Sequence, residues 1–254
     1  MRQLCAERIE PHVAGWFERG RIDDVRGLAK ELGALGVLGM HLEGYGCAGM
    51  SATEYGLACL ELEAADSGIR CLVSVQGSLA MFTLWRWGSA EQKAGWLPRL
   101  DGVRLPADGV LPGVTGLKGP LSCLNEARYG ITWGAIGAAR SALAAALSHA
   151  GDRVQFGRPI AGFQLTQQTL HLGRREDAGE LRPEQVSLGK LNNAREVLEI
   201  CRAARTILGA NGISLEYPVI RHANNLEPVL PHEGTVEMHT LVVGQAMSGQ
   251  AAFR

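Results

Sequence analysis

The sequence predicts a mainly α-helical protein, and three features carry that prediction. Apolar residues recur at helical spacing, most clearly over residues 23–39. At two places a Ser is followed three residues later by Glu or Gln, the capping-box pattern that begins a helix. These pairs are Ser51 with Glu54 and Ser89 with Gln92. A stretch rich in Pro and Gly, residues 101–120, separates the helical patterns into two halves.

We expect a succession of helices on each side of that stretch. Before it, the helical segments are residues 23–39, 52–65, 70–87 and 90–96. After it, they are residues 124–149, 164–175, 184–208 and the segment from 235 to the C-terminus. Gly88 directly follows one of these segments, as a C′ glycine follows many helices.

The composition excludes several classes of protein. With 254 residues, 46% apolar and 20% charged, the chain can bury a core of ordinary size. A net charge of -1 gives no general basic field for nucleic acid or anionic membrane. No apolar run reaches the roughly 20 residues of a membrane span, and charged residues interrupt the first apolar positions, unlike a secretory signal. We therefore expect a cytoplasmic protein that binds neither nucleic acid nor membrane.

Some local patterns suggest ligands that the surrounding sequence does not support. Residues 44–49 satisfy G-x-G-x-x-G, but residues 37–42 before them make a poor strand, so we prefer a glycine-rich loop to a nicotinamide site. His232 and His239 lie seven residues apart, whereas a zincin helix needs its two His one turn apart. The six cysteines stand singly, which favours reduced, packed thiols. We expect no metal site.

Four segments of the chain carry a resemblance to a known family. They are DSGIRCLVSVQGSL (66–79), CLNEARYGITWGAIGAA (123–139), DRVQFGRPIAGFQLTQQ (152–168) and ILGANGISLEYPVIRHANNLEPVLPHEGTVEMHTLVVGQAMSGQAAF (207–253). In order and spacing they resemble the acyl-CoA dehydrogenases, and within that family the glutaryl-CoA dehydrogenases most. The resemblance runs through most of the chain.

The resemblance implies an N-terminal helical domain in residues 1–100 and a C-terminal helical bundle in residues 120–254. The family places an antiparallel β domain between them. Residues 101–119 leave room only for a linker or a remnant of it, because a β sandwich takes on the order of 100 residues. The segment 164–175 is also short beside 184–208. The family's usual homotetramer is implied as well.

The resemblance also implies a reaction. In this family FAD accepts a hydride from the β-carbon of an acyl-CoA thioester while the Glu of an E-G-T motif removes the α-proton. Here that motif is Glu233-Gly234-Thr235. A helix N-terminus favours the ionised carboxylate and burial raises its pKa, and we expect burial to win once substrate is bound. His232 stands where the family usually has Tyr. Electrons would pass to an electron-transfer flavoprotein.

Binding residues carry over position by position. The flavin contacts match Arg153, whose guanidinium suits a diphosphate, Gln164, the turn of Thr206, Ile207, Leu208, Gly209 and Ala210, and also Thr235 and Phe253. The substrate contacts match Glu63, Arg70, Cys71, Arg128 and Gly234. Arg70 matches the residue that binds the far carboxylate of glutaryl-CoA, which implies oxidative decarboxylation to crotonyl-CoA. The alternative is a non-catalytic helical oligomer, or a relative that no longer binds flavin.

Overall fold

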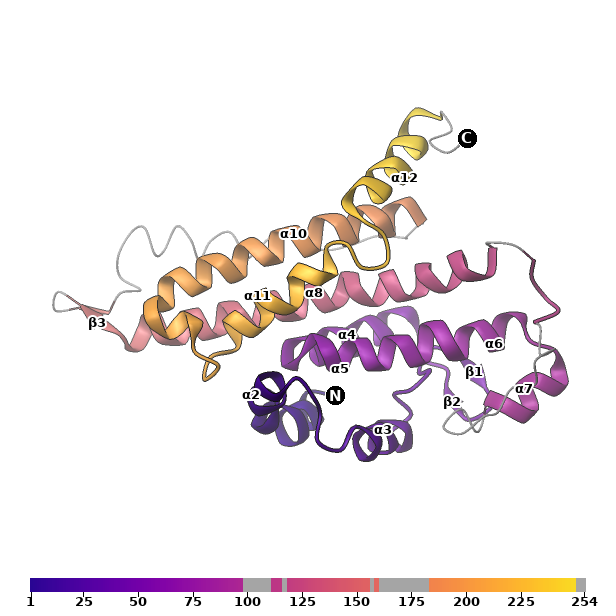
Figure 1. Ribbon diagram of the computed structural model, residues 1–254, viewed down its shortest axis with the longest axis horizontal. Helices are drawn as coiled ribbons and strands as arrows, with labels where there is room; N and C mark the ends of the chain where they lie inside the picture. The colour runs from indigo at the N-terminus through magenta and orange to yellow at the C-terminus, as the bar shows by residue number, and fades with distance from the viewer. Residues whose placement is uncertain (98–110, 116–117, 156–157, 160–182, 250–254) are drawn as a thin grey trace.

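The computed structural model describes residues 1–97, 111–115, 118–155, 158–159 and 183–249, and these form a helical protein (Figure 1). The N-terminal part contains α1 (Arg2–Leu4), the π-helical η1 (Cys5–Ile9), α2 (Glu10–Arg19), α3 (Val25–Ala34), α4 (Ala52–Ala65), α5 (Ser67–Ser74), the π-helical η2 (Val75–Met81), α6 (Phe82–Trp87) and α7 (Ala90–Trp96). The C-terminal part contains α8 (Lys118–Asp152), α10 (Pro183–Leu208), the 3-10 turn η6 (Gly209–Ile213), α11 (Pro218–Val229) and α12 (Val236–Ser248).

Helix α8 joins the two parts of the molecule. It packs against α4 on one side and α10 on the other, as Figure 1 shows. Its buried positions carry mostly small residues, among them Gly130, Gly134, Ala135, Gly137, Ala138, Ala142 and Ala146. At Gly137 an added Cβ would stand 1.9 Å from the carbonyl oxygen of Leu60. The two helices therefore approach to backbone contact, which only a residue without a Cβ allows there.

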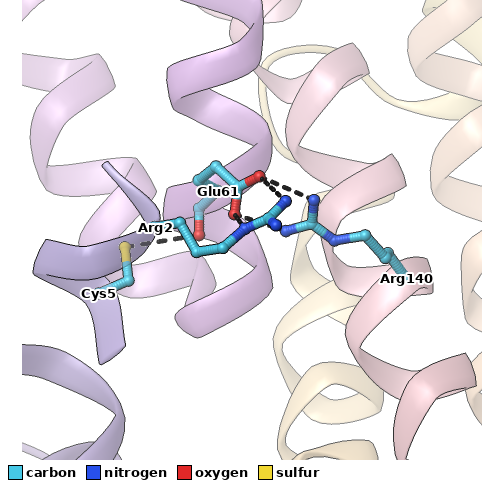
Figure 2. Close-up of polar contacts among 4 residues, drawn as sticks. All are labelled: Arg2, Cys5, Glu61 and Arg140. Carbon is cyan, nitrogen blue, oxygen red and sulfur yellow. Dashed lines mark hydrogen bonds and ion pairs between the residues drawn. The ribbon is translucent and has the colours of Figure 1, made fainter. Parts of the chain in front are cut away.

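A two-sided ion pair holds the start of the chain and α8 to α4. Arg2 and Arg140 both reach the carboxylate of Glu61 on α4, and their side chains come from the left and the right of the view in Figure 2. Arg2 donates to the two carboxylate oxygens at 3.1 and 2.8 Å. Arg140 of α8 donates to the same oxygens at 2.8 and 2.7 Å. One carboxylate thus links three segments that are far apart in the sequence.

The predicted helix starts are confirmed. Ser51 accepts a hydrogen bond from the backbone N–H of Glu54, whose side chain accepts in return from the backbone of Ser51, at the start of α4. Ser89 and Gln92 form the same box at the start of α7. The helices expected over 124–149 and 184–208 are α8 and α10, each somewhat longer than predicted. The helix expected over 164–175 lies outside the described residues.

Some predicted helix ends are wrong. The helix expected to continue to residue 39 stops at Ala34, because Gly36 turns the chain with a φ of 71°. The helical run expected from residue 70 begins at Ser67, after Asp66 has capped it. Gly88 is not a left-handed C′ glycine, since its φ is -74°. Glycine is needed there for another reason: an added Cβ would stand 2.6 Å from the Leu84 carbonyl oxygen.

Strands are few in the described residues. β1 (Glu43–Gly44) and β2 (Cys47–Ala48) pair antiparallel, with Glu43 opposite Ala48, and β3 (Val154–Gln155) pairs with β4 (Arg158–Pro159). The G-x-G-x-x-G stretch is thus the turn of a small hairpin between helices, as preferred from the sequence. Only residues 97–117 connect α7 to α8, too few for a β sandwich. No described helix has the length and hydropathy to cross a membrane.

Candidate active site

The turn between α11 and α12 carries Glu233 in an unusual backbone conformation. Glu233 has a φ of 58° and Gly234 a φ of 120°. A left-handed conformation is unfavourable for a residue with a Cβ, and it persists only where the surroundings impose it. At Gly234 an added Cβ would also stand 3.0 Å from Nε2 of His239. Thr235 then caps α12, because its Oγ1 accepts from the N–H of Met238 at 3.4 Å.

Two cationic side chains hold this turn. Arg128 of α8 donates from Nε to the carbonyl oxygen of Glu233 at 2.9 Å. Lys190 of α10 donates from Nζ to the carbonyl oxygens of Leu230 at 2.7 Å and Gly234 at 3.0 Å. Both cations bind backbone oxygens, so these hydrogen bonds leave the carboxylate of Glu233 available for other partners.

The Glu233 carboxylate is buried and only partly paired. Its side chain is 5% exposed, and Oε1 lies 3.5 Å from Nε2 of His232. Oε2 is buried without a hydrogen-bond partner among the described residues. Burial raises the pKa of Glu233, and the nearby charges of His232, Arg70, Arg128 and Lys190 oppose that rise. A buried carboxylate with a free oxygen and a raised pKa is chemically suited to accept a proton.

A second buried pair lies beside this carboxylate. Arg70 of α5 donates from Nε to Oε2 of Glu63 on α4, and both side chains are almost fully buried. The hydroxyl of Ser67 donates to the other oxygen of Glu63 at 2.5 Å. Burial opposes the charge on Arg70, but the charge and hydrogen bond of Glu63 outweigh it, so the pKa of Arg70 is raised. Gly134 of α8 leaves the space that Glu63 fills, since a Cβ there would stand 2.7 Å from Oε2.

The structure brings the residues matched to the substrate site into one region. Arg70 lies close enough to Glu233 for its charge to act on that carboxyl, and Arg128 binds the backbone of Glu233. Cys71 follows Arg70 and is half-buried. Burial raises the pKa of the Cys71 thiol, and the charge of Glu233 adds to the rise. Glu63 joins the group through Arg70.

The residues matched to flavin contacts fall into two separate sets. Thr235 lies next to Glu233. Thr206, Ile207 and Leu208 end α10, about 27 Å along that helix from Lys190, and Gly209 and Ala210 begin η6. Arg153 lies at the same end of the molecule as η6. Its backbone N–H donates to the carbonyl oxygen of His149, and the His149 ring packs edge-on against the ring of Tyr217, which follows η6. Arg153, Thr206, Gly209 and Ala210 are exposed, whereas the Leu208 side chain is in the core. Gln164 and Phe253 lie outside the described residues.

Reasoning from the sequence missed Lys190. It stands at a buried position of α10, on the same helix face as Ala194, Val197 and Cys201. A lysine at the apolar positions of an otherwise amphipathic helix is a signal that could have found it, because lysine is rarely fully buried unless paired. Its partners are 40 and 44 residues further along the chain, so only the fold identifies them.

Comparison with known proteins identifies the family. A family model of the acyl-CoA dehydrogenase N-terminal domain matches residues 1–101, and one of the C-terminal domain matches residues 115–248. The chain belongs to the acyl-CoA dehydrogenase family. The fold prediction is therefore confirmed: the helical parts of this family are present, and most of its middle β domain is absent from this chain.

Several acyl-CoA dehydrogenases are similar to this chain over different lengths. A solved glutaryl-CoA dehydrogenase from Mycobacterium smegmatis is 47% identical with a TM-score of 0.91, covering 100% of this chain and 94% of that one. Another structure of a glutaryl-CoA dehydrogenase from that organism, in complex with FADH2, is 42% identical with a TM-score of 0.90 and the same coverage. Glutaryl-CoA dehydrogenase of Desulfococcus multivorans is 30% identical over 162 residues, 57% of this chain and 41% of the relative. The chain spans about two fifths of the length of the curated relatives it matches.

Proposed function

We propose that this chain oxidises an acyl-CoA thioester with FAD, and that the substrate is glutaryl-CoA. The observation that carries the proposal is the buried Glu233 carboxylate, with one free oxygen, at the first residue of the E-G-T motif and beside Arg70. The similarity to two glutaryl-CoA dehydrogenase structures supports the choice of substrate. In this proposal Glu233 removes the α-proton and the β-hydride leaves for FAD; the far carboxylate then leaves as CO2 and a proton takes its place, which gives crotonyl-CoA.

The residues around Glu233 would have distinct roles in this reaction. Oε2 of Glu233 would take the proton, because no described residue occupies it. The backbone N–H of Glu233 would face the thioester oxygen, where negative charge develops as the proton leaves. Arg128 would keep the turn in place through the Glu233 carbonyl. The apolar helices around the site would exclude water, which keeps the carboxylate basic.

Arg70 would bind the far carboxylate of the substrate. Its Nε is used by Glu63, and no hydrogen bond of its two terminal nitrogens is found in the described part of the chain. A guanidinium presents those nitrogens as a fork that matches a carboxylate. Glu63 would hold the guanidinium in the orientation that presents it. Cys71 and Gly234 would line the same space.

The residues matched to FAD contacts suit the cofactor chemically. Arg153 offers an exposed guanidinium for a diphosphate, and at Gly209, which has a φ of 59°, an added Cβ would meet nothing within 4 Å, so a ligand can approach the backbone there. When bound, FAD would accept the β-hydride. The two sets lie about 27 Å apart along α10, which supports an assembly in which a neighbouring copy supplies one set, and the resemblance implies that this assembly is a homotetramer.

The remaining assignments are also proposals. An electron-transfer flavoprotein would take the electrons from the reduced cofactor, and the protein would work in the cytoplasm. The chain would divide into an N-terminal helical domain in residues 1–100, a remnant of the β domain or a linker in residues 101–119, and a C-terminal helical bundle in residues 120–254. The rival hypothesis is an oligomer without flavin, favoured by the short connection between α7 and α8.

The test is the colour of the purified protein and its response to substrate. We expect a yellow protein whose flavin absorbance is bleached by glutaryl-CoA under anaerobic conditions. Glu233→Gln should keep the colour and bleach at least about 100-fold more slowly, the usual loss when a general base is removed. Glu237→Gln, an exposed glutamate on the next turn, is the matched control and should bleach normally. A colourless, stable oligomer would establish the rival hypothesis, and bleaching by Glu233→Gln at the native rate would remove Glu233 from its role.

A further inference from the structure

Lys190 is a buried lysine that no step proposed above uses. It is 1% exposed, and its Nζ donates to the carbonyl oxygens of Leu230 and Gly234. The first of these residues precedes Glu233 by three positions, and the second follows it directly. A single ammonium group from α10 therefore connects the two sides of the turn that carries Glu233.

The turn needs such a connection because it is strained. A left-handed backbone is unfavourable at a non-glycine residue, and Glu233 adopts it with a φ of 58°. Neither adjoining helix includes the turn, since α11 ends at Val229 and α12 begins at Val236. Carbonyl oxygens at positions 230, 233 and 234 are all bound by cations, the middle one by Arg128. The strained conformation is thus held from outside the turn.

Packing alone does not explain why a charged side chain is buried at position 190. Burying an ammonium group is unfavourable, so an apolar side chain of similar volume would be more stable at this position if it served only to fill space. Burial lowers the pKa of Lys190 to about 8, while the charge of Glu233 acts in the opposite direction. The ammonium is therefore protonated at neutral pH, where its positive charge favours the ionised form of Glu233.

Other charged groups face Glu233 from every neighbouring element. His232 belongs to the same turn, Arg70 projects from α5, and Arg128 from α8. His239 of α12 lies against Gly234, and burial lowers its pKa to about 4, so it is neutral near pH 7. Glu63 of α4 pairs with Arg70 and reduces the effect of that cation. Among the charged groups around Glu233, Lys190 and Arg128 donate hydrogen bonds to the backbone of the turn.

We propose that Lys190 is a positioning residue for Glu233: it fixes the strained turn through both carbonyls and keeps the carboxylate ionised by its charge. The catalytic meaning of this inference rests on the proposed function. The physical coupling between the two residues does not, so it can be measured without flavin or substrate.

The first experiment follows the titration of Glu233 in the full chain. Protein labelled with ¹³C at the glutamate carboxyl carbon is titrated by NMR, and Glu233→Gln identifies the Glu233 signal. In Lys190→Met, which keeps the length but loses the charge and the donors, we expect the pKa of Glu233 to rise by about one unit. Hydrogen exchange in the peptide containing residues 230–236 should become at least tenfold faster. Lys30→Met, an exposed lysine on α3, is the matched control and should change neither.

A second measurement keeps Lys190 in place, in case Lys190→Met does not fold. Coupling between two titrating groups is reciprocal. In Glu233→Gln the pKa of Lys190, followed at its ¹³Cε, should therefore fall by an amount similar to the rise expected for Glu233. An unchanged Lys190 titration in that variant would overturn the proposal, as would Lys190→Met folding normally with the Glu233 titration and turn exchange of the native chain.

The catalytic consequence can be separated from the coupling. Glu233 must be ionised to accept a proton, so a higher pKa moves the rising limb of the kcat–pH profile to higher pH. We expect Lys190→Met to shift that limb by about one unit and to lower kcat more than it changes KM, with Lys190→Arg restoring most of the profile. A colourless protein that shows the reciprocal shifts would refute the enzyme proposal alone, and an active enzyme without the shifts would refute the role of Lys190 alone.

Discussion

At the scale of single residues, the substrate choice proposed above would depend on Arg70. Because Glu63 occupies its Nε, a substrate carboxylate would meet the terminal nitrogens. We expect Arg70→Met to lower kcat/KM about 10- to 100-fold more for glutaryl-CoA than for butyryl-CoA, since a hydrogen bond to a charged group is worth about 1.5–3 kcal/mol. Competition between the two substrates in one reaction measures this ratio directly.

The control for this prediction concerns Glu63. Arg70→Met leaves Glu63 buried without its cation, which destabilises the fold and lowers the activity on every substrate. The double variant Arg70→Met with Glu63→Gln removes that buried charge and should show the same substrate ratio. Equal losses on glutaryl-CoA and butyryl-CoA in both variants would show that Arg70 serves only the structure.

The residue scale also shows how far a sequence can define a site. Glu233 and Arg70 were predictable because each lies in a run of residues that resembles a known family, although their roles stay predictions. Lys190 was not, because its partners are backbone carbonyls that carry no side-chain signature. The left-handed conformation of Glu233 was equally hidden, since nothing local to a glutamate calls for it.

At the scale of elements, the contact between α4 and α8 depends on Gly137. An added Cβ would meet backbone atoms, 1.9 Å from the Leu60 oxygen and 3.1 Å from the Ala64 nitrogen, and backbone cannot move aside without shifting a helix. We expect Gly137→Ala to lower the free energy of unfolding by about 1–3 kcal/mol, as overpacking does, despite the better helix propensity of Ala. Urea unfolding measures the change.

A second glycine on α8 provides the control. At Gly151 an added Cβ would meet nothing within 4 Å, so Gly151→Ala changes helix propensity without a clash. It should leave stability unchanged or raise it by up to about 1 kcal/mol. If Gly137→Ala behaved in the same way, the close approach of α4 and α8 would not be a requirement of the fold.

Element boundaries were predictable where a local side-chain contact sets them. The capping boxes of α4 and α7 fix helix starts within four residues of sequence, and both were found. Helix α11 was not predicted, because Pro218 and Pro228 are usual signs of a break. Pro218 stands at the first turn, where its missing N–H costs nothing, and packing of Val219 and Leu226 in the core supports the rest. Tertiary packing, and not the local sequence, therefore determines that residues 218–229 are helical.

At the scale of the whole molecule, the resemblance of the two helical parts and the number of residues between them predicted that most of the β domain is missing. A count of residues between two recognisable helical parts excludes a sandwich, whatever their detailed arrangement. The separation of the flavin-matched residues could not be predicted in this way. It depends on the direction in which α10 runs past the Glu233 turn, which only the three-dimensional packing fixes.

The contact of the N-terminal segment with the bundle should depend on pH through Glu61. Hydrogen bonds from Arg140 and Arg2, with the charges of both, lower the pKa of Glu61 from 4.5 to about 2 (Figure 2). A depressed carboxyl pKa stabilises the fold above about pH 4.5, and this contribution is lost as the pH falls toward 2. We expect Glu61→Gln to lower the free energy of unfolding by about 1–2 kcal/mol at pH 7, since exposed arginines weaken the pair, and by progressively less below pH 4.5.

Urea midpoints between pH 7 and pH 3 measure this change in stability. The control is Glu196→Gln, which removes an exposed ion pair with Arg195. A difference between Glu61→Gln and the native chain that stays constant down to pH 3 would show that the carboxylate contributes through packing, not through its charge.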